Sequence, residues 1–524
     1  MPVVKITLFI TLTVLGISIR LIKITQPFVD QWSWRQSDVA TIAENFYNHG
    51  FNVFYPQINW AGNAPGYVGT EFPLIPLIAS LGYGLFGVHE WVGRLVSVGF
   101  FAASVPFFYL LAKKIYGERS AFFAVAVYNI VPLSVFAGRA FMPDMPALAL
   151  SIIALYFFLQ WLENERSAKL FTGAASATAL AILMKLPAII LGLPYLYVLW
   201  QRYGAGWMQK LHVWGFAAAS LALPALWYSH AFLISLNHFP FHFFGEAGLG
   251  ILSLEQYWDL LRRIATSSLS PIVFAAMVIG IFLLPSRGEL RYVFHLWLLA
   301  NLLFIVFAGK GNRRHEWYQL PVAPIAAAFA GHVFEVGWLR LKRQRVTRLL
   351  RAFVIVVLFG ALGYFSYRYL IPFYEPAFAA LEIAGRELNA TAPKNSLVAI
   401  ADSGNPTGIY YGKRKGCHMY KPVDGPEAVN TLEELRKAGI TFFVLPSYNF
   451  RWLSDYPEFR EHLSLYQRVK ETGEYIILDL TASKHEDRAP QARAETAQAP
   501  TLAKESLSAE ICSCPTPEYR CRRG

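Results

Sequence analysis

Residues 72–88 read FPLIPLIASLGYGLFGV, and the placement of this segment decides how the whole chain is arranged. The run is apolar, but it is shorter than the about 20 residues that a membrane-spanning helix needs. Pro73 and Pro76 interrupt it, as do three glycines. We interpret it as a helix that lies in the membrane interface or dips into it. The longer apolar run at residues 93–112 is then the span that follows.

Basic residues around these two runs support this arrangement. Lys5 lies near the N-terminus, and Lys113 and Lys114 belong to a basic loop after residue 112. Basic loops stay on the cytoplasmic side, which places both segments there. The chain between them therefore crosses the membrane twice, once outward through residues 4–24 and once back. The polar residues 25–71 and the run that follows them are expected on the outer face.

The composition agrees with a membrane protein. Hydrophobic residues make up 55% of the 524 residues and charged residues 16%, whereas soluble domains carry about 25% charged residues. The net charge is +12. In a membrane protein this excess reports orientation and contact with anionic lipid, so a nucleic-acid partner is not expected.

The remaining apolar runs extend the same topology to the end of a membrane module. The very basic residues 340–351 fall on the cytoplasmic side of it. Residues 371–481 alternate short β-rich and helical runs, which predicts a small extracytoplasmic α/β domain. Residues 482–524 have little apolar content, so we expect a disordered tail. The predicted fold is thus an α-helical polytopic membrane module, residues 1–370, followed by these two segments. The eleven predicted spans are residues 4–24, 93–112, 119–137, 147–162, 170–184, 188–201, 211–229, 270–285, 292–308, 320–337 and 352–370.

Asp30 is the outer-face residue whose position best suits chemistry. It follows the first span, and the aromatic residues Trp32 and Trp34 would hold it at the interface. A carboxylate there can act as general base toward a hydroxyl. The structural alternative is a helix cap, but Asp38, which opens an amphipathic run at residues 38–48, is the better capping candidate. Arg35 and Asp38 are expected to support Asp30.

Glu71 is a second outer-face carboxylate, just before the 72–88 segment. It can favour the start of that helix through the helix dipole, or it can bind a metal ion with outer-loop histidines. His238 and His242 are four residues apart, which would place them on one face of a helix. Pro240 between them argues against that helix, so this is a weak metal signal.

Two further outer loops carry candidate charges. Asp144 stands at the start of the 147–162 span, where capping is the structural alternative, and Arg139 could pair with it or with a phosphate. The loop around residues 309–319 places a basic cluster on the outer side, against the usual rule. This cluster suggests an anion site for a phosphate leaving group. It consists of Lys310, Arg313, Arg314, His315 and Tyr318.

The order of these motifs resembles the bacterial family 39 glycosyltransferases, the group that includes protein O-mannosyltransferases and lipid A aminoarabinose transferases and has the GT-C fold. The resemblance covers residues 1 to about 370. It implies a glycosyl transfer from a polyprenyl-phosphate sugar to a glycan, lipid or protein acceptor at the outer face of a bacterial inner membrane. The matching stretches are DQWSWRQSDVATIAENFY (30–47), GTEFPL (69–74), GRLVS (93–97), GRAFMPD (138–144), and Lys310 followed by YQLPVAP (318–324).

The resemblance also implies roles for single residues. Asp30 falls on the catalytic base and Asp144 on a second acidic residue. Glu71 matches a carboxylate near a metal, so a divalent cation is the one cofactor to consider. Aminoarabinose transferases place a phosphate-binding lysine where this chain has Phe72, so Lys185 or Lys310 would take that role.

The expected reaction is a single displacement with inversion. Asp30 would take the acceptor proton, and the charge of the leaving polyprenyl phosphate would be offset by Arg139, Lys310 and Arg313. We expect Asp30→Asn to abolish transfer. Asp30-Gln31 replaces the Asp-Glu pair of protein mannosyltransferases, which argues against a strict assignment to them. Two alternatives are a lipid-sugar flippase or transporter, and a polysaccharide polymerase or ligase with a lipid-diphosphate donor.

Overall fold

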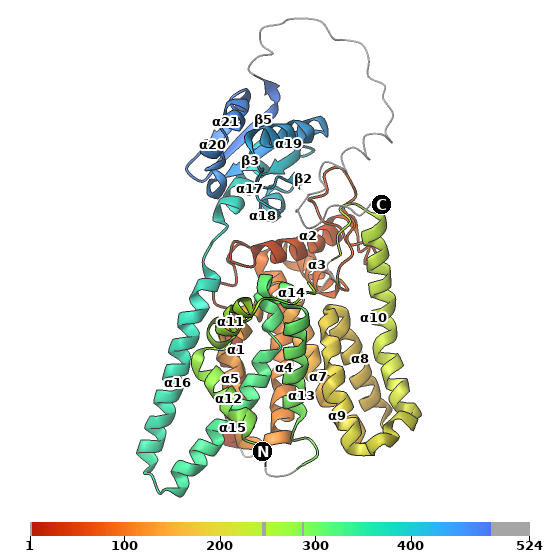
Figure 1. The fold of residues 1–524 in the computed structure, drawn as a ribbon, viewed down its shortest axis with the longest axis vertical. Coiled ribbons are helices and arrows are strands. Elements are labelled where there is room, and N and C mark those ends of the chain that lie inside the picture. Colours follow the sequence, from red (N-terminus) through yellow and green to blue (C-terminus); the bar gives the residue numbers. More distant parts are fainter. Residues whose placement is uncertain (1–2, 244–247, 286–287, 484–524) are drawn as a thin grey trace, which may run out of the picture.

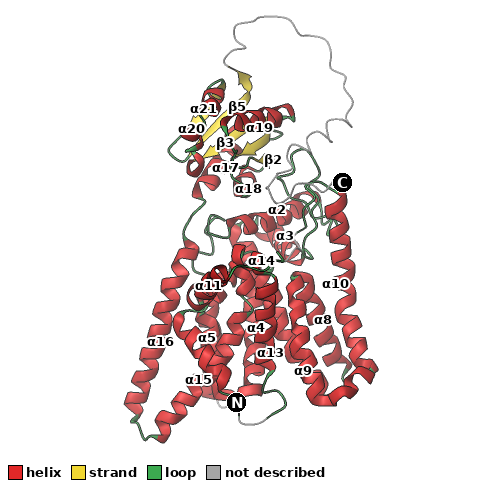
Figure 2. Ribbon diagram, viewed as in Figure 1, coloured by secondary structure: helices red, strands yellow, loops and turns green. Residues whose placement is uncertain are grey.

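The protein, described by a computed structural model over residues 3–243, 248–285 and 288–483, has two parts (Figure 1). A helical bundle forms one part, and the named strands all belong to a smaller domain at one end of that bundle (Figure 2). The first half of the bundle contains α1 (Val3–Arg20), α2 (Ser33–His49), α3 (Leu74–Phe86), α4 (Glu90–Tyr116), α5 (Glu118–Ile130), α6 (Pro132–Ala137), α7 (Asp144–Glu163), α8 (Ala168–Met184), η1 (Leu186–Leu191) and α9 (Gly192–Tyr203). The second half contains η2 (Gly204–Gln209), α10 (Leu211–Asn237), α11 (Leu254–Arg263), η3 (Ile264–Ser268), α12 (Pro271–Phe282), α13 (Val293–Phe307), α14 (Gly309–Arg314), η4 (Glu316–Gln319), α15 (Val322–Arg343), α16 (Arg348–Leu370) and η5 (Ile371–Tyr374).

The bundle is that of an integral membrane protein. Within the described ranges, six helices are long and apolar enough to cross a membrane. The helical segments Leu254–Ser268 and Pro271–Phe282 meet at a bend of 110°, and they add a seventh span if they are counted as one. Each of the eleven predicted spans coincides with one bundle helix or with two consecutive ones. Residues 119–137, for example, form α5 and α6, because Pro132 cannot donate the hydrogen bond that would continue the first helix. The number eleven stays a prediction.

The two ends of the bundle are distinct, as the sequence predicts. Lys5 forms an ion pair with Glu118, which places the start of α1 beside the turn between α4 and α5. The turn between α15 and α16 lies at the same end (Figure 1). At the opposite end, α2 and α3 pack against each other across the bundle (Figure 1). With only 13 residues, α3 agrees with the short interfacial helix expected at residues 72–88.

Helix α2 differs from its prediction in two ways. It begins at Ser33, five residues before the expected start, so Asp38 lies in its second turn and the prediction that Asp38 caps this helix is wrong. It is also buried over most of its length instead of being amphipathic. The reason is that α3 covers one side and α18 of the smaller domain covers another, a contact that no local pattern in the sequence announces.

The smaller domain is a five-stranded mixed sheet with helices on both faces. The strand order is β2-β1-β3-β5-β4, with β2, β1 and β3 parallel and β5 antiparallel to both of its neighbours. This confirms the predicted α/β domain. The part of the predicted tail beyond residue 483 lies outside the described residues. The domain contains α17 (Ala379–Thr391), β1 (Leu397–Ile400), α18 (Thr407–Gly412), β2 (Lys415–His418), α19 (Gly425–Lys437), β3 (Ile440–Pro446), η6 (Ser447–Asn449), α20 (Trp452–Asp455), α21 (Pro457–Leu463), β4 (Tyr466–Glu471) and β5 (Tyr475–Ser483).

The domain rests directly on the loop that follows α1. The backbone N–H of Phe28 donates to Tyr411 Oη at 2.8 Å. Asn405 Nδ2 donates to Ser33 Oγ at 3.0 Å. Phe28, Ser33 and Asn405 are buried, so the first loop, α2 and the C-terminal domain form one packed layer over the end of the bundle.

Candidate active site

Four charged residues meet at the end of the bundle, and we call them the charged cluster: the buried Arg35, Glu71 and Asp144 and the largely buried Lys185. Arg35 Nη2 lies 2.5 Å from Glu71 Oε2. Lys185 Nζ lies 2.7 Å from Asp144 Oδ1 and 4.0 Å from Glu71 Oε1. The cluster therefore joins residues from α2, the first loop, α7 and the end of α8, and its two cations balance its two anions.

Local structure fixes the members of the cluster in place. Asp144 is the first residue of α7, and Lys185 follows the last residue of α8, the helix that packs along α7. The Thr70 hydroxyl donates to Glu71 Oε2 at 3.0 Å. The N–H of Phe72 donates to the carbonyl of Leu183 at 3.0 Å. These bonds hold the first loop against the end of α8, so Glu71 and Lys185 approach each other.

The surroundings favour the charged forms of Glu71 and Lys185, whereas burial raises the pKa of Asp144. Burial raises the pKa of the Glu71 carboxyl, but Arg35 and Lys185 outweigh burial and bring that pKa below its usual value. Burial lowers the pKa of Lys185, but Asp144, Tyr318 and Glu71 outweigh it and bring that pKa above its usual value. Lys185 is therefore a largely buried cation paired with Asp144, the kind of group that stabilises charge on a phosphate.

A partly open pocket lies beside Lys185 and Asp144. Lys185 Nζ lies 4.8 Å from the centre of the Tyr318 ring, which forms another wall. The remaining lining is mostly apolar, so the pocket has a charged mouth and an apolar body. That combination suits an anion carried on a hydrocarbon chain. The other lining residues are Ala147, Leu148, Ser151, Pro187, Ala188, Ile190, Leu191, Trp297, Phe304, Trp317, Leu320 and Pro321.

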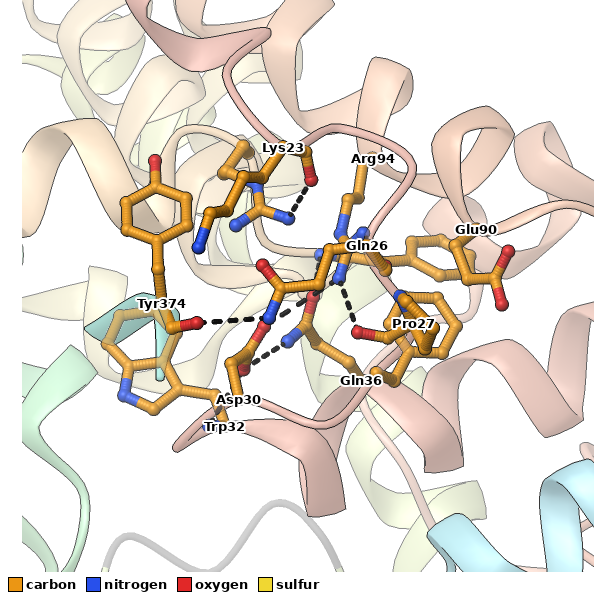
Figure 3. A network of polar contacts seen from close by, with 12 residues as sticks. Lys23, Gln26, Pro27, Asp30, Trp32, Gln36, Glu90, Arg94 and Tyr374 are labelled. Atoms are coloured by element: carbon orange, nitrogen blue, oxygen red, sulfur yellow. Dashed lines mark hydrogen bonds and ion pairs between the residues drawn. The ribbon is translucent and has the colours of Figure 1, made fainter. Parts of the chain in front are cut away.

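Asp30 belongs to a neighbouring network that Figure 3 shows. Its side chain is completely buried. Asp30 Oδ1 accepts hydrogen bonds from Trp32 N at 3.0 Å and from Gln36 Nε2 at 2.8 Å. Arg94 Nη2 lies 3.6 Å from Asp30 Oδ2, and Arg94 also donates to the carbonyls of Ile24 and Gln26. This network ties the chain after α1 to α2 and α4.

Arg139 joins that network instead of the charged cluster. Its Nη2 donates to the carbonyl of Lys23 at 2.7 Å, and its guanidinium carbon lies 4.8 Å from the centre of the Tyr374 ring. Asp144 takes Lys185 as its ion-pair partner. The pairing of Arg139 with Asp144 that the sequence suggested is therefore wrong.

The basic loop divides into two parts. Lys310 and Arg313 are exposed on α14. His315 lies further in, with its ring stacked on Trp34 at 5.9 Å. Burial, helped by the positive charges of Lys185 and other basic groups, lowers the pKa of His315 to about 3. Only the C-terminal half of this loop, with His315 and Tyr318, approaches the charged cluster.

The predicted metal ligands do not form a site that fits a metal. Within the described ranges, no three His, Cys, Asp or Glu side chains gather closely enough to hold an ion. Glu71 is engaged by Arg35 and Lys185. The His238 ring packs against the rings of Tyr55 and Tyr67 at 6.0 and 5.3 Å. We therefore derive no step through a metal ion.

His242 approaches the cluster but has properties of a neutral, buried ring. Burial and the charge of Arg35 lower the pKa of His242 to about 4, although Glu71 opposes them. Its carbonyl accepts a hydrogen bond from Gly69 N at 3.1 Å, which holds the outer loop beside Glu71.

The structure adds residues that the sequence did not single out. Glu316 accepts a hydrogen bond from Trp32 Nε1 at 2.7 Å. His418 and Asp402 of the C-terminal domain form a buried pair at 2.8 Å close to α2. These residues are far apart in the sequence, and no motif spacing could have paired them.

Comparison with known proteins finds similarity to a mannosyltransferase family over part of the chain. The family of dolichyl-phosphate-mannose-protein mannosyltransferases matches residues 69–228. An uncharacterized protein of Aquifex aeolicus (strain VF5) is 24% identical over 417 residues, which cover 67% of this chain and 81% of that protein. The family match includes α3, Asp144 and Lys185.

Two solved structures share the fold. ArnT from Cupriavidus metallidurans bound to undecaprenyl phosphate has a TM-score of 0.63 at 15% identity, covering 91% of this chain and 98% of ArnT. The oligosaccharyltransferase AglB from Archaeoglobus fulgidus, in complex with an inhibitory peptide and a dolichol-phosphate, has a TM-score of 0.57 at 11% identity. That match covers 93% of this chain and 75% of AglB. The GT-C fold that the sequence predicted is therefore confirmed.

Proposed function

We propose that the protein is an inverting glycosyltransferase that moves a sugar from a polyprenyl-phosphate donor to a hydroxyl or amine acceptor. One observation carries this proposal: the largely buried cation Lys185 lies at the charged mouth of a mostly apolar pocket. A polyprenyl phosphate has the same division between an anion and a hydrocarbon chain. The fold and the mannosyltransferase match support the same reaction class.

In this proposal the donor phosphate binds at Lys185 and the lipid chain occupies the apolar part of the pocket. Arg35 lies on the other side of Glu71 and adds a second cation near the phosphate. Lys310, Arg313 and Arg139 were expected to share this role. Lys310 and Arg313 are exposed on α14 and Arg139 lies in the Asp30 network, so we assign the main contribution to Lys185 with Tyr318.

The chemical step needs a leaving group and a proton acceptor. The leaving polyprenyl phosphate is stable as an anion, and fixed cations such as Lys185 lower the barrier further. The resemblance assigns proton abstraction to Asp30 and a second acidic role to Asp144. Asp144 lines the pocket, whereas the Asp30 carboxylate is held by Trp32 N, Gln36 and Arg94.

We also propose that the site faces the outer side of a bacterial inner membrane. The basic turn between α15 and α16 lies at the end of the bundle opposite to the C-terminal domain (Figure 1). Arg340, Lys342 and Arg343 lie in the last turn of α15. Such residues stay cytoplasmic, which would leave the charged cluster and the C-terminal domain outside.

Two tests separate this proposal from its alternatives. The purified protein is incubated with undecaprenyl monophosphate and diphosphate sugars, and release of the lipid phosphate is measured by mass spectrometry. Turnover of a monophosphate sugar supports the proposal. Turnover of diphosphate sugars alone indicates a polymerase or ligase. Transport without hydrolysis or transfer, measured in proteoliposomes, indicates a flippase.

Lys185→Gln is the matching variant. A hydrogen bond to a charged group contributes about 1.5–3 kcal/mol, so we expect the affinity for undecaprenyl phosphate to fall roughly 10- to 150-fold. Lys169→Gln is the control, because Lys169 is exposed near the opposite end of the same helix. Equal affinities of the two variants would contradict the assignment of the phosphate site.

A further inference from the structure

Helix α2 directs its polar side chains to two different sides. Trp34 and Arg35 precede Asp38 by four and three residues, so both share a face of the helix with Asp38. Arg35 on this face pairs with Glu71 of the charged cluster. Gln36, which holds Asp30, is two residues from both Trp34 and Asp38 and faces away from them. The face of α2 that belongs to the charged cluster therefore carries Asp38, and Asp30 lies on the other side.

The Asp38 carboxylate is only half satisfied. Its Oδ1 accepts a hydrogen bond from Trp60 Nε1 at 2.9 Å. Its Oδ2 is fully buried and has no hydrogen-bond partner in the part of the chain that the structure describes. Leaving a buried carboxylate oxygen unbonded is costly. A ligand hydroxyl that donates to Oδ2 would remove this cost.

The second carboxylate oxygen of Asp30 is in a different situation. It also lacks a hydrogen bond within the described residues, but Arg94 Nη2 faces it at 3.6 Å. Arg94 at the same time donates to two carbonyls of the chain after α1. These contacts are those of a carboxylate that holds a loop in place.

Asp38 lies between the charged cluster and the C-terminal domain. On one side stands Arg35 with Glu71. On the other side the Trp60 ring lies 5.2 Å from the ring of His418, and His418 Nδ1 lies 2.8 Å from Asp402 Oδ1. Asp38 therefore lies where the charged cluster, the first loop and the C-terminal domain meet.

We propose that Asp38 is the general base of the transfer and that Trp60 and His418 line the acceptor side of the site. This inference rests on the proposed glycosyltransferase function. It assigns Asp30 the role of a positioning residue that fixes the first loop through Arg94. It also assigns the C-terminal domain a direct part in holding a hydroxyl acceptor.

The step balances without a further reactant. The acceptor O–H bond breaks and its proton goes to Asp38 Oδ2, while the acceptor oxygen bonds to the anomeric carbon of the donor sugar. The bond between that carbon and the phosphate oxygen breaks, and its electron pair leaves with the polyprenyl phosphate. Lys185 and Arg35 stabilise that anion, and Asp38 later returns the proton to water.

The electrostatics of Asp38 agree with this role. Burial raises the pKa of Asp38 to about 6, and the negative charge of Glu71 acts in the same direction. Arg35, the hydrogen bond from Trp60 and His418 oppose this rise. These are the charged and titratable groups that face Asp38 from α2, the first loop and the C-terminal domain. A base with a pKa near the working pH is efficient.

The test compares Asp38→Asn with Asp30→Asn in the full-length protein. Turnover uses the undecaprenyl monophosphate sugar that the wild type accepts, and binding uses undecaprenyl phosphate alone. We expect Asp38→Asn to lose about 10²- to 10⁴-fold in kcat with a binding affinity within about twofold of wild type. Asp30→Asn is expected to be less stable to heat than wild type, because it removes the carboxylate that Arg94 faces. Turnover of Asp38→Asn within tenfold of wild type would overturn the proposal.

Trp60→Phe provides a second measurement if Asp38→Asn fails to fold. This variant keeps the ring and removes the N–H that donates to Asp38, so the pKa of Asp38 rises. The acid limb of kcat/KM should move to higher pH by a measurable fraction of a unit, a change that a purely structural Trp60 would not cause. If the acid limb of kcat/KM does not move, the result contradicts the assignment of Asp38 as the general base. A wild type that turns over no lipid-phosphate sugar refutes the glycosyltransferase proposal itself, which is a different result.

Discussion

The ion pair between Arg35 and Glu71 offers a direct test of how the charged cluster is built. Both side chains are about 5% exposed, and Arg35 Nη2 lies 2.5 Å from Glu71 Oε2. Two charges at about 4 Å attract by about 4 kcal/mol at an effective dielectric constant of about 20. Removing one partner of such a buried pair typically costs about 3–5 kcal/mol, because the other charge stays buried without compensation. Lys185, 4.0 Å from Glu71 Oε1, partly compensates Glu71, so we expect Arg35→Met to cost about 3 kcal/mol.

The double variant Arg35→Met with Glu71→Leu should recover most of this loss, because an apolar pair of similar volume often replaces a buried ion pair without cost. The assay is the free energy of unfolding of the detergent-solubilised protein, followed by intrinsic tryptophan fluorescence. The affinity for undecaprenyl phosphate is measured on the same samples. We expect the double variant to be stable but to bind the lipid phosphate more weakly than wild type. A loss below 1 kcal/mol for Arg35→Met would mean that the pair behaves as a solvated surface ion pair, and the buried cluster would then be wrong.

Two further predictions concern the loop between α13 and α15. Burial lowers the pKa of His315 in the folded protein to about 3, whereas the unfolded chain has the usual value of 6.5. The unfolded state therefore binds a proton first, and the protein loses stability as the pH falls below 6.5. We expect the free energy of unfolding to drop by about 2 kcal/mol more between pH 7 and pH 5 in wild type than in His315→Phe; parallel pH profiles would contradict the burial of this ring. Lys310→Gln and Arg313→Gln remove exposed charges, so each should change the affinity for undecaprenyl phosphate less than threefold at physiological salt. A loss as large as that of Lys185→Gln would return the phosphate site to the basic loop.

The sequence predicts which segments share one end of the bundle because that placement depends on local quantities. Apolar run length and the position of Lys and Arg place residues 72–88 at one end of the bundle, and α3 lies there. The same reasoning brings Glu71, Asp144 and Lys185 to one end, where the structure joins them.

Pairing within that end could not be predicted. Asp144 has Arg139 five residues away in the sequence, yet its partner is Lys185, which the packing of α7 on α8 brings to 2.7 Å.

The start of the helix that contains Asp38 could not be predicted either. A start at Ser33 instead of Asp38 moves Asp38 from a capping position to the face of Arg35, and the sequence between the two residues contains no proline or glycine that would mark the start.

The contacts of the C-terminal domain bear on how an acceptor is selected. A domain that opens and closes over a site needs an interface that separates at low cost. Here the N–H of Gly416 donates to the carbonyl of Asn59 at 2.9 Å, and the N–H of Phe378 donates to the carbonyl of Val29 at 3.0 Å. Together with the buried bond between Asn405 and Ser33, these contacts attach the domain at three points to the first loop and α2. Opening would leave buried polar groups unpaired, so we expect the domain to stay in place over the first loop, and under the proposal made above its shape beside Asp38 would influence which acceptor binds.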